Sequence, residues 1–152
     1  MERAYIAVVQ KHESVLEDIK QSVEEKGTPN EVAYSTSPVY VIKRADLRPP
    51  QPIDVVISGN IFDHGRSGTE FAKDLKMLVP DVLFLMYSIM PEVNEQIDGI
   101  IEKPDWALID SELHGNLVEI LTSQEFGEIA KRKPIDYNRL REQFPQIQLL
   151  NH

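Results

Sequence analysis

The sequence predicts an α/β fold, a doubly wound five-stranded parallel sheet with helices on both faces. Short apolar runs of strand length alternate along the chain with amphipathic segments of helical spacing. Apolar runs without polar alternation are typical of strands buried on both faces, as in a parallel sheet. Strands that alternate with helices imply right-handed crossovers, which place helices on both sides of the sheet.

The first strand and helix have clear sequence signals. Tyr5–Val9 is an unbroken apolar run, which predicts a buried strand. Ser14 and Glu17 have the spacing of a capping box, and apolar residues follow at every fourth position up to residue 23. Gly27 is a typical residue for the end of this helix.

The second unit has weaker signals and the third stronger ones. We expect a short strand at 32–35 and a helix at 39–47, before a proline-rich connector at 49–52. Val55–Ser58 is a second fully apolar strand. A capping box at Ser67 and Glu70 then introduces a helix.

The last two strands are predicted at 82–87 and 99–102, and a helix at 106–122 follows them. Only ten residues, 89–98, lie between these strands, and they must include two connectors. A helical turn takes about 3.6 residues, so the fourth helix is predicted to be short or missing.

The charge and composition of the chain exclude several classes of function. Its 25 acidic and 16 basic residues give a net charge of -9, which disfavours direct nucleic-acid binding and anionic membranes. The chain has no cysteine, hence no disulfide and no thiolate metal site. No apolar stretch approaches the roughly 18 residues of a membrane span, and the first residues do not resemble a signal peptide. We therefore expect a soluble cytoplasmic protein.

Functional residues of a doubly wound sheet gather at the carboxyl ends of its strands. The residues predicted at these ends are Gln10, Lys11, Gly59, Asn60, Ser88 and Lys103.

Three segments, in this order and spacing, carry a family resemblance: 52–58, 68–71 and 99–104. With them the chain resembles the receiver domain of two-component response regulators, which has the flavodoxin-like chemotaxis-regulator fold. The resemblance covers residues 5–122 and implies the strand order 2-1-3-4-5. We accordingly divide the chain into a receiver-like domain, 1–123, and a C-terminal extension, 124–152.

The resemblance also implies a phosphorylation pocket that this chain lacks. In an active receiver, two acidic residues after the first strand and an aspartate after the third hold Mg²⁺ while the aspartate accepts a phosphoryl group. Here the acidic pair falls on Gln10 and Lys11, and the aspartate falls on Gly59 or, with a shift of one residue, on Asn60. None of these can form an aspartyl phosphate, and the Lys11 ammonium would repel a divalent cation.

The two remaining positions of the receiver pocket are retained in this chain. Ser88 stands at the hydroxyl position and Lys103 at the phosphate-sensing position, where it could donate to Asn60 or to a backbone carbonyl. The resemblance further implies a cis peptide bond before Pro104. The switch aromatic of the fifth strand is replaced by the isoleucines 100–101. This combination indicates a degenerate pseudo-receiver.

Other polar residues have an ordinary interpretation beside a functional one. Asp63 and His64 could accept a phosphoryl group or bind a metal, but such loops more often simply turn. His12 is expected at the solvated rim. His114, with Glu112, is expected on the solvated face of a helix.

No catalytic residues or metal ligands are predicted. Ser58 and Ser88 lack a recognisable nucleophile motif, so we expect no enzymatic activity and no cofactor. Trp106 is equally compatible with a partner contact and with a core position.

The C-terminal extension differs in charge from the rest of the chain. Residues 124–152 contain five basic and four acidic residues, a net charge of +1, so residues 1–123 carry -10. This asymmetry favours a helical extension docked on the acidic domain. The alternative is a partner-binding or dimerising arm, in which Tyr137 and Phe144 are candidate contacts.

These observations lead to one functional hypothesis and two alternatives. The hypothesis is a non-catalytic, phosphorylation-independent pseudo-receiver that binds another signalling or regulatory protein, with a homodimer also possible. One alternative is phosphotransfer on a displaced carboxylate such as Asp63 or Asp98. The other is a small anion held by Lys103 and the backbone amides of 65–68.

Overall fold

The computed structural model describes residues 3–103 and 114–150. Its helices and strands are, in chain order, β1 (Tyr5–Val9), α1 (Glu13–Lys26), β2 (Glu31–Ser35), α2 (Pro38–Ala45), β3 (Val55–Ser58), the 3₁₀ turn η1 (Asp63–Gly65), α3 (Gly68–Leu78), β4 (Leu83–Ser88), β5 (Gly99–Glu102), α4 (Gly115–Leu121), α5 (Gln124–Lys131), α6 (Tyr137–Gln143) and β6 (Ile147–Leu149).

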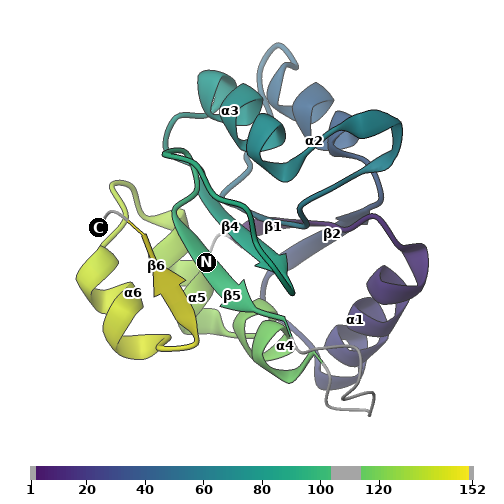
Figure 1. Cartoon of the computed structure of the whole chain (residues 1–152). Helices are drawn as coiled ribbons and strands as arrows, with labels where there is room; N and C mark the ends of the chain where they lie inside the picture. Colours follow the sequence, from purple (N-terminus) through teal and green to yellow (C-terminus); the bar gives the residue numbers. More distant parts are fainter. Residues whose placement is uncertain (1–2, 104–113, 151–152) are drawn as a thin grey trace.

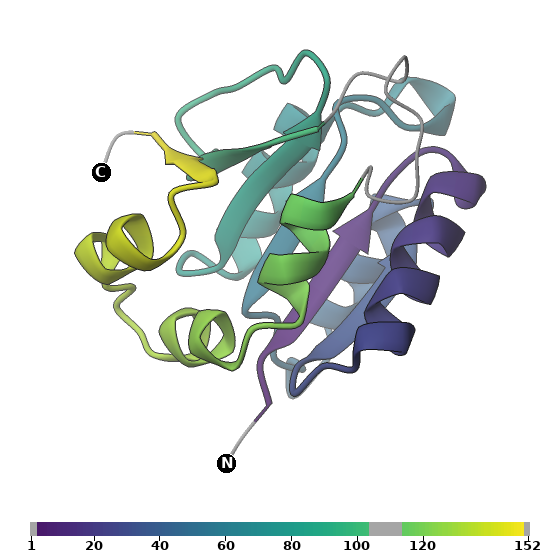
Figure 2. The same ribbon diagram turned by 90° about the horizontal axis from the view of Figure 1, so that it is seen from below.

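The strands form a single sheet in the order β2-β1-β3-β4-β5-β6. The first five strands are parallel, which confirms the predicted order 2-1-3-4-5. Helices α2 and α3 cover one face of the sheet, and α1, α4, α5 and α6 lie on the other (Figure 1). Seen from below, α1 and α4 lie side by side along the sheet (Figure 2). The carboxyl ends of the parallel strands therefore share one edge of the molecule.

The five predicted parallel strands are confirmed, and the extension adds a sixth strand that was not predicted. In β6, Leu149 lies opposite Gly99 and Ile147 opposite Ile101 in antiparallel register with β5. Ile147 is buried whereas Gln148 is exposed, so the segment alternates as a strand does. Pairing with β6 satisfies backbone groups of β5 that would otherwise form an open sheet edge. The expected helical extension is thus helical only up to residue 143.

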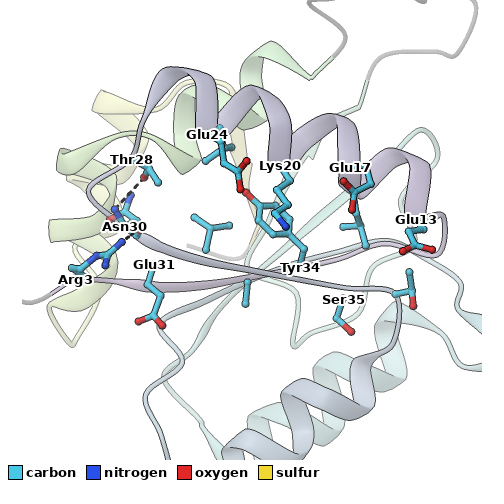
Figure 3. Close-up of a pocket in the computed structure, with 15 residues that line it drawn as sticks. Arg3, Glu13, Glu17, Lys20, Glu24, Thr28, Asn30, Glu31, Tyr34 and Ser35 are labelled. Carbon is cyan, nitrogen blue, oxygen red and sulfur yellow. Dashed lines mark hydrogen bonds between the residues drawn. The ribbon is translucent and has the colours of Figure 1, made fainter.

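At the other end of the sheet, β2 is the outermost strand and pairs only with β1 among the described strands. Helix α1 crosses above this strand and leaves a groove beside it (Figure 3).

The helix starts are partly as predicted. Helix α3 begins after Ser67, whose hydroxyl accepts a hydrogen bond from the Glu70 amide at 3.1 Å, as the capping box predicts. Helix α1 starts before Ser14, because the His12 carbonyl already accepts from the amides of residues 15 and 16. It ends at Gly27 with φ 80°, a conformation that favours glycine.

Residues 89–98 contain no helix, which confirms the short or missing fourth helix. The helix expected at 39–47 is Pro38–Ala45, capped by Ser37. Of the helix expected at 106–122, the described part is Gly115–Leu121.

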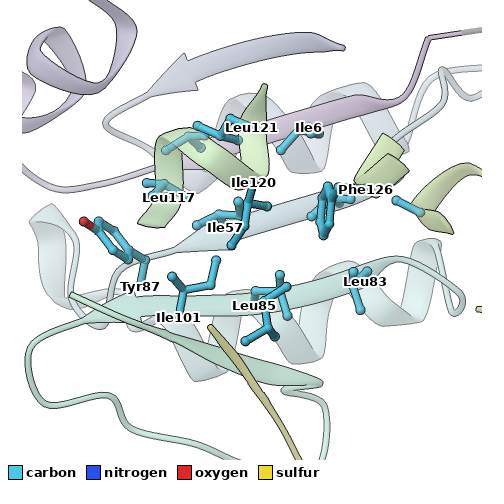
Figure 4. Packing of buried hydrophobic residues seen from close by; sticks show 14 of the residues in the cluster. Ile6, Ile57, Leu83, Leu85, Tyr87, Ile101, Leu117, Ile120, Leu121 and Phe126 are labelled. Atoms are coloured by element: carbon cyan, nitrogen blue, oxygen red, sulfur yellow. The ribbon is translucent and has the colours of Figure 1, made fainter. Parts of the chain in front are cut away.

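Two apolar layers sandwich the sheet. In β1, Ile6 and Val8 point into the cluster beneath α1, α4, α5 and α6, while Ala7 and Val9 point into the cluster beneath α2 and α3. The first cluster includes Leu117, Ile120 and Phe126 from the covering helices (Figure 4).

The extension contributes directly to this first layer. Phe126, Leu140, Phe144 and Ile147 belong to the same buried cluster as β1, β3 and β4. Residues 124–150 and the preceding residues therefore share one core. Within the described residues, no helix has both the length and the apolar character needed to cross a membrane.

Candidate functional site

The carboxyl ends of β1, β3, β4 and β5 surround a pocket of about 320 Å³. It is lined by Gln10, Lys11, His12, Gly59, Asn60, Ile61, Tyr87, Ser88 and Lys103. All six predicted pocket residues thus lie together, as the parallel topology requires.

Gln10 fills the centre of this site. Its side chain is 4 % exposed, and its Nε2 donates to the Tyr87 carbonyl at 3.2 Å. Its Oε1 accepts from Lys103 Nζ at 3.3 Å. Among the described residues, the partner of Lys103 is thus the Gln10 side chain, which the sequence did not predict. The acceptor for the lysine is therefore an uncharged amide oxygen.

Both Gly59 and Asn60 line the pocket, and the side-chain position of Gly59 is the one that lies against Gln10. A β-carbon on Gly59 would point at the Gln10 amide, 3.5 Å from both Nε2 and Oε1. The Gly59 amide still donates to Val9 at 2.9 Å, so this residue continues the pairing of β3 with β1.

Asn60 is turned towards the loop that replaces the fourth helix. Its Nδ2 donates to the Met90 carbonyl, and its Oδ1 accepts from the Glu92 amide at 2.9 Å. Asn60 therefore anchors the 89–98 loop to the end of β3.

Lys103 is only partly exposed to water, and burial lowers its pKa below the ordinary lysine value. Its Nζ lies 5.5 Å from the centre of the Tyr87 ring, within the range of a cation–π contact. Lys11 is exposed at the rim. The central charged group of the pocket is therefore a cation that is held by neutral partners.

Tyr87 and His114 form a buried pair that the sequence analysis missed. The Tyr87 hydroxyl and His114 Nδ1 are 2.6 Å apart, and His114 is 7 % exposed. The expectation of a solvated His114 was thus wrong. Burial and the nearby Lys103 charge lower the pKa of His114, and burial raises the pKa of Tyr87. No spacing rule links residues that are so distant in sequence.

The displaced carboxylates lie elsewhere. Asp63 is exposed in η1 and does not line the pocket. Asp98 lies just before β5, at the amino ends of the parallel strands. Its Oδ2 accepts from Lys76 Nζ at 2.7 Å and from the Phe84 amide at 2.8 Å. Asp98 is therefore separated from the pocket by the length of the strands.

The loop 60–68 is closed by its own backbone hydrogen bonds. Phe62 donates to Arg66 at 2.8 Å, and the Gly68 amide donates to Asn60 at 2.6 Å. The Gly68 amide proposed for anion binding is thus already used. The side chain of Ser58 is buried and donates to the Gly59 carbonyl, and His12 is exposed at the rim as expected.

The other residues predicted from the sequence lie either outside the described residues or in or against the core. Pro104, Trp106 and Glu112 lie outside the described residues, and so does the side chain of His64. Phe144 is 6 % exposed and belongs to the core, so it offers no surface for a partner. Tyr137 is half-buried and packs against the same core.

A second hollow lies beside the 89–98 loop, which contains no helix. This groove of about 340 Å³ is lined by Ser88, Ile89, Pro91, Ile100, Glu102, Asn116, Pro145, Gln146 and Gln148. Beside it, the loop exposes apolar side chains: Ile89 is 47 % exposed, Met90 80 % and Val93 49 %. The missing helix therefore leaves a partly apolar surface next to the pocket.

A metal site is not apparent in residues 3–103 and 114–150, which contain no cluster of three or more histidine or carboxylate side chains suited to a metal ion.

No family model matches the chain, and no curated protein matches it in sequence. Solved structures do match its fold. The signal receiver domain of an HD domain-containing protein from Pseudomonas fluorescens Pf-5 aligns with a TM-score of 0.60 at 16 % identity, over 84 % of this chain and 99 % of that chain.

Two further receivers agree. A chemotaxis response regulator of Vibrio cholerae aligns with a TM-score of 0.57 at 17 % identity, over 79 % of this chain and 99 % of its own. A phosphorylated cyanobacterial phytochrome response regulator aligns with a TM-score of 0.60 at 12 % identity, over 80 % and 96 %. The chain has the receiver fold.

Proposed function

Because its fold is that of receiver domains, we propose that this protein is a pseudo-receiver, which works in signalling by binding another protein and is not phosphorylated on aspartate. The observation that carries the proposal is the hydrogen bond between Lys103 and Gln10 beside the bare backbone of Gly59. Mg²⁺ prefers several oxygen ligands, usually carboxylates, and phosphoryl transfer depends on the charge that the metal offsets.

The same site supports a function that involves no turnover. The pocket contains an amide, a glycine and a lysine with a depressed pKa, and no carboxylate of the described residues lines it. The exposed apolar side chains of the 89–98 loop favour contact with a protein partner. That partner would be another signalling or regulatory protein.

The test is chemical labelling. The protein is incubated with Mg²⁺ and acetyl phosphate, and intact-mass spectrometry measures the fraction that gains one phosphoryl group, with an active receiver treated in parallel. We expect no stoichiometric labelling. Stoichiometric labelling would overturn the proposal, and its loss in Asp63→Asn would then assign the phosphoryl group to Asp63.

A further inference from the structure

The outer edge of β2 presents unpaired backbone groups. The Glu31 amide donates to Ala4 and the Ser35 carbonyl accepts from Gln10, so both residues direct their backbone groups towards β1. Backbone groups alternate sides along a strand, so the N–H and C=O groups of Val32 and Tyr34 point away from the sheet. No strand in residues 3–103 and 114–150 covers this edge, which can therefore accept another strand.

A groove runs beside the same edge. It has a volume of about 710 Å³ and lies between α1 and β2 (Figure 3). The side chains of Val32 and Tyr34 form part of its floor and pack against the cluster that contains Leu16 and Val23. An added strand would thus find side-chain space as well as backbone partners.

The charges along the groove are mainly acidic. Glu13, Glu17, Lys20 and Glu24 follow one another at spacings of four, three and four residues, so they line one side of α1. With Glu31 and Arg3, the lining contains four carboxylates and two cations.

Two observations favour a positively charged ligand in this groove: Arg3 is already engaged by backbone carbonyls, and Glu24 acts on Tyr34. The Arg3 guanidinium already donates to the carbonyls of Pro29 and Asn30, at 3.3 and 3.1 Å. Burial first, and the negative charge of Glu24 second, raise the pKa of Tyr34 to about 12, so this glutamate of α1 acts on a residue of the strand.

We propose that the open edge of β2 and the α1 groove bind an extended, lysine- or arginine-rich segment of a partner protein, which joins the sheet as an additional strand. Main-chain hydrogen bonds to Val32 and Tyr34 would give affinity, and alternate basic side chains would lie beneath the glutamates of α1. A second copy of this edge fits less well, since pairing would bring Glu31 and the α1 glutamates near like charges. The inference rests on the proposed function, because it names the class of partner.

The probe is a synthetic eight-residue peptide in which lysine alternates with valine or threonine. Its matched control has glutamate in place of each lysine. Titration of the ¹⁵N-labelled full chain with the lysine peptide should give saturable shifts of the Val32 and Tyr34 amide signals. Titration with the glutamate peptide should give none. Shifts confined to other strands, or no saturable shifts, would overturn the proposal. Self-association through β2, detected by sedimentation, would replace it with a homodimer.

Two double variants separate the local charge of the groove from the net charge of the protein. The double variant Glu17→Lys with Glu24→Lys should weaken binding of the lysine peptide by about tenfold or more. The double variant Glu95→Lys with Glu142→Lys makes the same charge change at exposed residues outside the groove and should keep the affinity within about twofold. Equal losses in both would show that only the net charge matters, which contradicts the proposal.

Backbone pairing is tested with two N-methylated peptides, one modified at odd positions and one at even positions. A strand directs alternate amides to its two sides, so one of the two peptides should lose binding and the other should keep it. Equal binding of both would exclude strand addition. Failure in these titrations, while the chain also stays unlabelled by acetyl phosphate, would remove the β2 site and leave the pseudo-receiver proposal standing.

Discussion

At the scale of residues, the chemistry of the pocket depends on two uncharged residues, Gly59 and Gln10. Gly59 offers no side chain towards Gln10, and Gln10 offers Lys103 an amide where a carboxylate would carry a full negative charge. Lys103 keeps a hydrogen bond but gains no ion pair there, and burial accordingly lowers its pKa. At this end of the sheet, the Lys103 cation is therefore held by an uncharged amide.

Gly68 is a position where the fold itself requires glycine. A β-carbon there would collide with the Gly59 carbonyl oxygen and approach Met86, whereas one on Gly115 meets no described atom within 4 Å. Both residues begin a helix. We expect Gly68→Ala to lower the free energy of unfolding by about 3 kcal/mol and Gly115→Ala to raise it by up to about 1 kcal/mol. Urea denaturation measures both, and equal effects would contradict the close approach.

His114 should make the stability of the protein depend on pH. Burial and Lys103 lower its pKa below 6.5, so the folded state binds fewer protons than the unfolded chain. The stability that neutral His114 contributes is complete above about pH 6.5 and is lost as the pH falls towards its lower folded-state pKa. Urea midpoints between pH 8 and pH 5 should fall more steeply for the wild type than for His114→Gln. The exposed His12→Gln serves as control and should follow the wild type.

At the scale of elements, the two outer edges of the sheet differ in whether a described strand covers them. β5 is covered by β6, whose three residues are supplied by the extension. β2 remains open beside an acidic helix. An open strand edge is normally protected by charge, and the glutamates of α1 and Glu31 can fulfil this role until a basic strand binds.

The extension should contribute to the stability of the domain through its buried residues. Phe144 is buried and packs against Phe126 with ring centres 5.4 Å apart at 82°. We expect Phe144→Ala to cost about 3–5 kcal/mol in the free energy of unfolding, because it removes a buried aromatic ring and leaves a cavity. Gln148→Ala, an exposed residue of the adjoining strand, should change it by less than about 0.5 kcal/mol. Equal and small effects would mean that the extension packs loosely.

At the scale of the whole molecule, one apolar layer joins segments from both ends of the chain. Val8 of β1 and Ile147 of β6 belong to the same cluster, although almost the whole sequence lies between them. The predicted boundary after residue 123 does not separate two cores. A partner that engages the extension would therefore act on the stability of the entire sheet.

This shared core predicts a single unfolding transition. Far-UV circular dichroism, which reports all helices, and the NMR signal of the Phe144 ring should give the same urea midpoint. An earlier loss of the Phe144 signal would show that the extension unfolds as a separate unit.

The sequence by itself determined the βα order, the parallel sheet and which residues stand at the strand ends, because apolar periodicity and the residues that follow each strand are local properties of the chain. It did not predict β6, although residues 147–149 alternate, since a three-residue strand is stable only beside the particular edge that it covers. Only the tertiary structure placed Lys103 on Gln10 and Tyr87 on His114. These contacts join residues 93 and 27 positions apart, and sequence spacing carries no information on which distant polar groups will be buried together.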